Sequence, residues 1–213
     1  LFRSIAHLNR LESSAPDDES LLLLLIEALG KLADTYAGQN SNLGDRNRGR
    51  SLLVRREALV ERLGKLRPAS FDVERLRLDN QVRTIRLSHP APSWTAGVRL
   101  NALEPRVQRL LKAAPASRPL YRFATACYFQ RASYVGDRSS RISLFRRVLQ
   151  FASEDERLFG GEEVCWRSIA LAHKYIASNL ADGGAECDSH ARLAVAYDKK
   201  RVAHNPGNAT ARI

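Results

Sequence analysis

The sequence has no methionine, few glycines and prolines, and no long apolar run. Its 12 Gly and 8 Pro are spread over 213 residues, mostly between periodic stretches, which favours long helices joined by short loops. The longest aliphatic run, Leu21 to Ile26, is far shorter than the roughly 20 residues that a membrane-spanning helix needs. No charged-then-apolar leader opens the chain, so neither a membrane span nor a secretory signal is expected. Because the initiator methionine is missing too, we expect a fragment of a larger protein.

Cysteine is also scarce. The three cysteines, Cys127, Cys165 and Cys187, are odd in number and show no paired spacing. We therefore expect buried thiols in a reducing cytoplasm rather than disulfides. Cys187 and His190 have the spacing of a metal-binding pair, but a structural zinc site usually needs four ligands and no further two lie at a plausible distance. No metal site is predicted.

Catalytic motifs are missing as well. The sequence contains no Gly-rich phosphate loop, no His-Glu-x-x-His, no Gly-x-Ser-x-Gly and none of the kinase motifs. His173 lies on one apolar helical stripe with Trp166 and Ile169, so we interpret it as a hydrogen-bonded core histidine rather than a catalytic base. The chain is predicted to be non-enzymatic and to need no cofactor.

Positive charge, by contrast, is abundant. The 34 Lys and Arg residues exceed the 23 Asp and Glu residues, which gives a net charge of +11 and a pI near 10.1. Such a charge attracts nucleic acids and acidic partners. The arginines are spread over the periodic stretches instead of gathering in one tail, which is typical of solvated helix faces. Nucleic-acid or acidic-ligand binding is kept as the alternative function.

Helical periodicity runs through nearly the whole chain, and strand alternation is absent. The segment from Ser88 to Ser93 is predicted to be extended, because each of its two prolines disfavours the α region for the residue before it. The predicted helices cover residues 2–13, 18–36, 47–66, 71–88, 97–113, 118–133, 139–157, 162–181 and 187–204.

A repeat is visible in the helix terminators. Pro68, Pro115, Gly161 and Pro206 each follow an amphipathic stretch, at intervals of 47, 46 and 45 residues. Fixed periods of this length are typical of solenoids, in which each helical hairpin hides its apolar face against the next. We therefore predict an all-α domain of four stacked units. Their ranges are 18–68, 69–115, 116–161 and 162–206.

Three segments resemble tetratricopeptide repeats. They read Ala-Leu-Gly-Lys-Leu-Ala-Asp at 28–34, Asn-Leu-Gly-Asp at 42–45, and Ala-Leu from Ala58 with the terminator Pro68. More narrowly, they are similar to the long-period repeats that follow the kinase domain in some bacterial serine/threonine protein kinases, although Ala33 stands where that family has Gly.

The resemblance implies a right-handed superhelical solenoid of antiparallel hairpins whose first helices line a concave groove. It also implies a cytoplasmic scaffold or adaptor of a bacterial signalling protein, which binds a peptide or partner domain and whose kinase domain lies outside this chain. An exposed terminal hairpin could also pair with a second copy to form a homo-dimer. No membrane partner is expected.

The loop at 38–45 carries the candidate partner-binding residues. It gives the first hairpin about six more residues than the later hairpins have, and functional residues often lie in such insertions. Asn40, Asn42 and Asp45 are the polar side chains that we expect to contact a partner. The alternative is that Asn and Gly here simply form turns.

Overall fold

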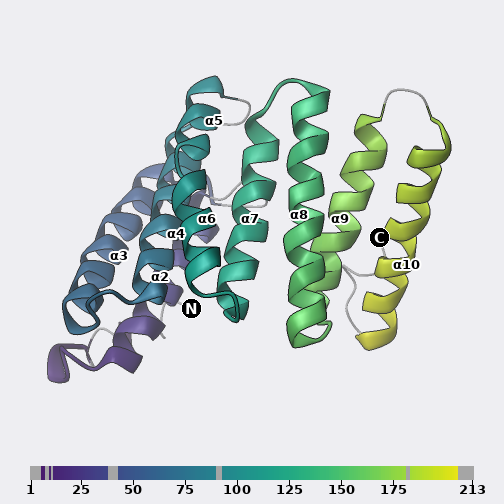
Figure 1. Ribbon diagram of the computed structural model, residues 1–213. Coiled ribbons are helices and arrows are strands. Elements are labelled where there is room, and N and C mark those ends of the chain that lie inside the picture. Colours follow the sequence, from purple (N-terminus) through teal and green to yellow (C-terminus); the bar gives the residue numbers. More distant parts are fainter. Residues whose placement is uncertain are drawn as a thin grey trace. The chain divides into compact units, whose positions relative to one another are not determined.

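A computed structural model describes residues 6–7, 10, 12–37, 43–89, 93–180 and 183–205 (Figure 1). All regular structure in these ranges is α-helical, as predicted, and no strand occurs among them. The chain divides into two compact units, Leu1–Pro90 and Ala91–Ile213, and the division falls within the proline-rich link. The four sequence repeats remain a prediction.

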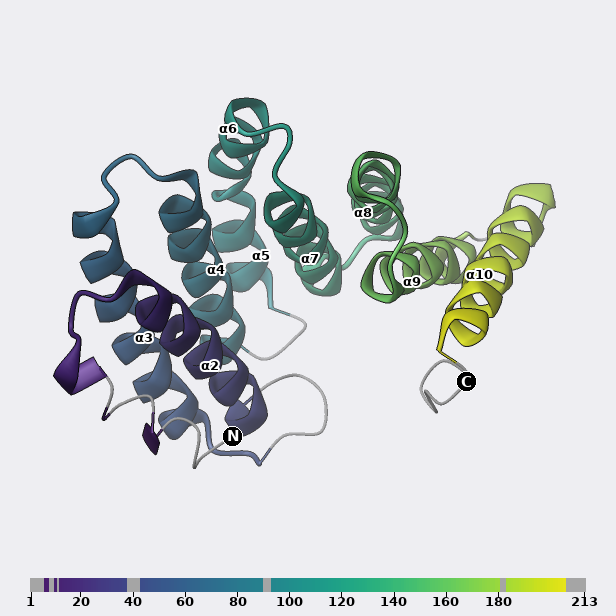
Figure 2. The same ribbon diagram turned by 90° about the horizontal axis from the view of Figure 1, so that it is seen from below.

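Unit 1 contains three long helices that pack around a common core (Figures 1 and 2). They start and end within a residue or two of the predicted positions. The helices are α2 (Glu19–Ala37), α3 (Arg46–Leu66) and α4 (Phe71–Ser88). Their apolar stripes meet in one cluster that includes Leu22, Leu25, Val60, Leu63 and Leu76. Of the predicted helix 2–13, the described residues 6, 7, 10, 12 and 13 are helical and the others lie outside the description.

Unit 2 contains six helices among its described residues. They are α5 (Trp94–Asn101), α6 (Glu104–Ala113), α7 (Arg118–Tyr134), α8 (Arg138–Phe159), α9 (Glu163–Asn179) and α10 (Ala185–His204). The predicted single helix 97–113 is wrong, because the chain breaks at Ala102 and Leu103. Pro105 explains the break: its ring fits the first turn of a new helix but would clash inside a continuous one.

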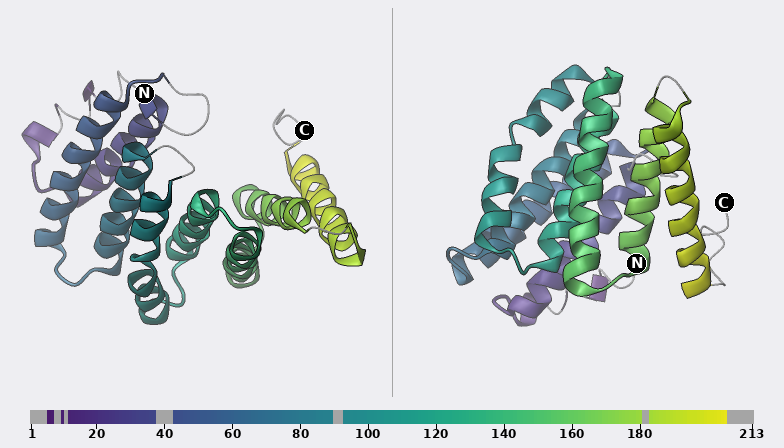
Figure 3. Two further views of the ribbon diagram at one scale, coloured as in Figure 1. Left: turned by 90° about the horizontal axis from the view of Figure 1, so that it is seen from above. Right: turned by 45° about the vertical axis from the view of Figure 1, so that its right-hand side comes forward.

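Helices α7 to α10 pack in chain order (Figure 3). α7 lies against α8, α8 against α9, and α9 against α10, while α5 and α6 rest on α7. The connection from α8 to α9 turns at Gly160, whose φ of 82° lies in the left-handed region that favours glycine at a helix end. Pro68, Pro115 and Gly161 all lie in turns between helices, and Pro206 lies outside the described residues.

None of the helices in the described ranges combines the length and the apolar character needed to cross a bilayer.

Candidate functional site

The sequence-predicted loop is only partly described. Asn40 and Asn42 lie outside the described residues. Asp45 is the N-cap of α3: its carboxylate accepts the N–H of Arg48 at 2.9 Å, and its own N–H donates to the carbonyl of Tyr36 at 3.0 Å. Asp45 therefore stabilises the start of α3. Its contact with a partner remains a prediction.

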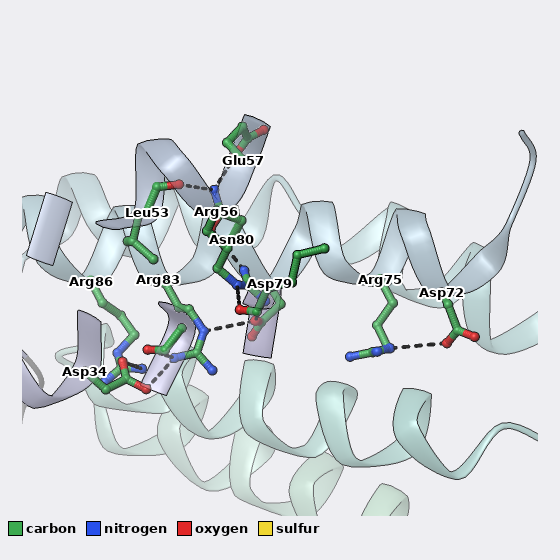
Figure 4. Close-up of polar contacts among 12 residues, drawn as sticks. Asp34, Leu53, Arg56, Glu57, Asp72, Arg75, Asp79, Asn80, Arg83 and Arg86 are labelled. Carbon is green, nitrogen blue, oxygen red and sulfur yellow. Dashed lines mark hydrogen bonds and ion pairs between the residues drawn. The ribbon is translucent and has the colours of Figure 1, made fainter. Parts of the chain in front are cut away.

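Unit 1 holds a buried polar cluster centred on Arg56 (Figure 4). The Arg56 residue is only 2% exposed, and its guanidinium donates to the carbonyl of Ile26 at 2.9 Å, to Asn80 Oδ1 at 3.0 Å and to Asp79 Oδ2 at 2.7 Å. Burial lowers the pKa of Arg56 because it disfavours the charged form, while Asp79 acts against this effect. One side chain of α3 is thus bonded to both α2 and α4.

Arg83 completes this cluster from α4. It donates to Asp79 at 2.9 Å, to the carbonyl of Gly30 at 3.1 Å and to Asp34, and Figure 4 shows it between the two carboxylates. A Cβ atom at Gly30 would lie 3.2 Å from Arg56 Nε, so glycine leaves the room that both guanidiniums use. Burial alone would raise the pKa of Asp79, but Arg83 and Arg56 outweigh it and the pKa is lowered. These groups satisfy one another and fasten the three helices together.

Unit 2 contains an open groove. It lies between α7 and α9, is also lined by residues of α8, and has a volume of about 380 Å³. Its surface is mainly apolar. The apolar lining includes Ala126, Phe129, Ala152, Val164, Cys165 and Leu171. α7 and α9 are the first helices of the third and fourth predicted units, so the groove occupies the position where a stack of hairpins is expected to bind a ligand.

Two oxygen atoms in this groove lack hydrogen-bond partners. Thr125 Oγ1 and Gln130 Oε1 are buried and unpaired, and the Thr125 residue is only 7% exposed. A buried polar atom left without a partner costs about 1–3 kcal/mol. Neither oxygen is exposed in this structure, so a ligand that donates hydrogen bonds would recover that energy after the two side chains rotate towards the groove. Sequence reasoning missed both residues; the available signal was a threonine within the apolar face of a helix.

An ion-pair network fixes one rim of the groove. Asp155 of α8 is buried and accepts from Arg118 Nε at 3.1 Å and from Arg122 Nε at 3.5 Å. Both arginines also contact Glu162, at the start of α9. The hydrogen bond from Arg122 lowers the pKa of Glu162, so this carboxylate stays charged near neutral pH. The network ties α7 to the end of α8 and the start of α9.

The groove contains a cysteine that is not reactive. Cys165 Sγ donates to the carbonyl of Ala152 at 3.0 Å, and burial raises the pKa of its thiol to about 12. Because the thiolate is the nucleophile, this thiol is inert near neutral pH. All three cysteines are free; Cys127 and Cys165 are buried as predicted, whereas Cys187 is only partly buried. Within the described ranges, no group of three His, Cys, Asp or Glu side chains is placed to hold a metal ion.

His173 is buried, and its ring is hydrogen-bonded to the ring of His190, as expected for a core histidine. Comparison of the chain with models of known protein families, with curated proteins and with solved structures found no match. Inference about function therefore starts from the groove and its unpaired oxygens.

Proposed function

We propose that the chain is a non-catalytic protein-interaction module that binds an extended peptide segment of a partner in the groove between α7 and α9. In this proposal the hairpins stack as a right-handed superhelix, and the module serves as a scaffold or adaptor of a cytoplasmic bacterial signalling protein associated with a kinase. The signalling context is supported by the sequence resemblance, and the peptide site by the groove.

The unpaired oxygens of Thr125 and Gln130 are the observation that carries the peptide proposal. An extended peptide presents backbone N–H groups, which are the donors that these oxygens lack. An apolar side chain of the same peptide fits over Ala126 and Ala152, where the lining residues are small. Main-chain hydrogen bonds combined with a pocket for one side chain are a common mode of peptide recognition.

The alternative, nucleic-acid binding, has less support from the arginines of the described chain. Arg56, Arg83, Arg118 and Arg122 all pair with carboxylates, so their charge is largely neutralised locally. A salt titration separates the two functions. Phosphate-driven binding weakens steeply with added salt, whereas docking of an apolar side chain in a groove does not.

The test is selection of peptides from a random library on the whole chain, followed by fluorescence polarisation with the selected peptides. Ala126→Phe fills the groove and is expected to weaken binding by about tenfold or more, equivalent to about 1.4 kcal/mol. Ala196→Phe places the same ring on an exposed position of α10 and is expected to leave binding unchanged. Equal binding by wild type and Ala126→Phe would show that the groove is not the site.

A second variant tests the unpaired oxygen directly. Gln130→Met keeps the length of the side chain but removes the buried amide. Peptide affinity is expected to fall by a factor of about five to ten, while the unfolding free energy of the free protein stays the same or rises, because the unpaired group is lost. A drop in stability with unchanged affinity contradicts the proposal, since Gln130 would then bond within the protein and not to the ligand.

A further inference from the structure

Two histidines from neighbouring helices face each other inside unit 2. His173 of α9 and His190 of α10 approach to 2.7 Å between their Nδ1 atoms, and their ring centroids are 4.9 Å apart. The His173 residue is only 9% exposed. An N···N separation of this length is a hydrogen bond, which requires one ring to donate an N–H and the other to accept it. The pair therefore shares a single proton between the two Nδ1 atoms.

The surroundings of the two rings differ. Glu186, one turn before His190 on α10, has a carboxylate oxygen 3.8 Å from His190 Nε2 and also accepts a hydrogen bond from Arg146 of α8 at 2.7 Å. The ring of Tyr197 of α10 stacks near His173 at 6.3 Å. A negative charge thus stands beside the outer nitrogen of His190, while an aromatic face covers His173.

Tyr197 links the pair to further charged groups. Its hydroxyl donates to Glu156 of α8 at 3.0 Å, and Lys200 of α10 lies 3.5 Å from the other oxygen of Glu156. The Glu156 charge is thus already engaged by Tyr197 and Lys200. Of the carboxylates near this pair, Glu186 is the one with a contact to a histidine nitrogen.

We propose that the His173–His190 pair is a pH-sensitive latch that holds α10 against α9 while one proton is shared and releases it when His173 is protonated. His190 donates its Nδ1–H to His173 Nδ1. A proton that binds His173 Nδ1 removes the acceptor and sets two N–H groups against each other.

The weak apolar packing of α10 makes this bond important. Among the residues of α10, Ala194 and Arg201 are the buried ones, whereas α9 buries several apolar side chains, including Ile169, Ala172 and Ile176. Burial, with a further contribution from His190, lowers the pKa of His173 to about 4. The latch is therefore closed near neutral pH and opens in acid. This inference is independent of peptide binding.

Hydrogen exchange of the whole chain tests the latch. Between about pH 7 and pH 4, after correction for intrinsic rates, protection of the α10 amides is expected to fall relative to α8, most steeply near about pH 5, where the fall approaches tenfold per pH unit. His173→Phe cannot be protonated and can still stack on Tyr197, so its α10 protection should not depend on pH. The matched control, His204→Phe, changes an exposed histidine of the same helix and should keep the acid response. An acid response in His173→Phe equal to that of wild type overturns the latch.

A measurement on the wild-type protein tests the latch without any variant, so it holds even if His173→Phe fails to fold. Nitrogen-15 NMR of the imidazoles is expected to show coupling between the two Nδ1 atoms across the hydrogen bond at neutral pH. This coupling should disappear over the same pH range in which α10 loses protection. Absence of the coupling at neutral pH, with the two rings titrating independently, would refute the proposal.

Discussion

The two units use arginine–carboxylate pairs in opposite ways. In unit 1, Asp79 is shared by Arg56 and Arg83 at a point where three helices meet, and the bonds close the interior. In unit 2, Asp155 is shared by Arg118 and Arg122, but its bonds brace one rim of an open groove. The same kind of ion pair therefore joins three helices in unit 1 and braces the rim of the groove in unit 2.

The Arg56 cluster differs from the α7–α9 groove in that its own polar atoms are paired. In the unit 1 cluster Asn80 accepts from Arg56 and donates to the carbonyl of Leu53 at 3.3 Å. In the unit 2 groove the oxygens of Thr125 and Gln130 are unpaired. Unpaired buried groups in a natural protein point to a missing partner, such as a ligand or ordered water. The groove is thus the better candidate for binding.

The largest expected loss of stability comes from breaking the buried polar cluster around Arg56. Asp79→Ala leaves two guanidiniums without their shared carboxylate and is expected to destabilise unit 1 by about 3–5 kcal/mol, the usual result of removing one member of a buried pair. Arg77→Ala, which breaks an exposed pair with Glu61, is the control and should cost less than about 1 kcal/mol. Denaturant unfolding, together with hydrogen exchange of α2 to α4, measures both. Similar losses in the two variants would mean that the cluster does not hold the helices together.

As the pH falls, unit 2 is expected to lose stability before unit 1 does. The pKa of His173 is about 4, below its ordinary value of 6.5, so the unfolded chain binds more protons between these values. Unit 2 is then fully stable above about pH 6.5 and loses up to about 1.4 kcal/mol per pH unit as the pH falls towards 4. The pKa of Asp79 is lowered by Arg83 and Arg56, so the corresponding loss in unit 1 falls below the ordinary aspartate pKa of 3.8.

Fluorescence can follow this difference. Both tryptophans, Trp94 and Trp166, belong to unit 2, so their emission reports on that unit alone. Hydrogen exchange of α3 reports on unit 1. We expect the tryptophan signal to change at a higher pH than the exchange of α3. The opposite order would contradict the assignment of the acid-sensitive group to His173.

The smallest expected effect concerns the cap of α3. Asp45→Ala removes the bond to the N–H of Arg48 and is expected to cost about 1 kcal/mol, whereas Asp45→Asn should cost little because its amide oxygen caps equally well. Neither variant should change binding of peptides in the α7–α9 groove. If Asp45→Ala keeps full stability but loses a selected peptide, the partner-binding hypothesis for this loop is correct and the groove is not the only contact.

Much of the helical fold could be predicted from the sequence because apolar periodicity and helix terminators are local signals. The break between α5 and α6 was missed, although Pro105 marks it, because the apolar pattern continues across it. The groove could not be predicted, since an unpaired oxygen such as Thr125 Oγ1 depends on how three helices pack. His173 was correctly placed in the core, but its partner His190 was interpreted only through its spacing to Cys187.

The bonds of Arg56 have a consequence for how unit 1 folds. In a hairpin of α2 and α3 alone this guanidinium would have only the carbonyl of Ile26 as a hydrogen-bond partner, because Asp79 and Asn80 belong to α4. Burying an unneutralised cation is strongly unfavourable. We therefore expect the three helices to fold as one cooperative unit, which is larger than the two-helix element predicted as the repeat.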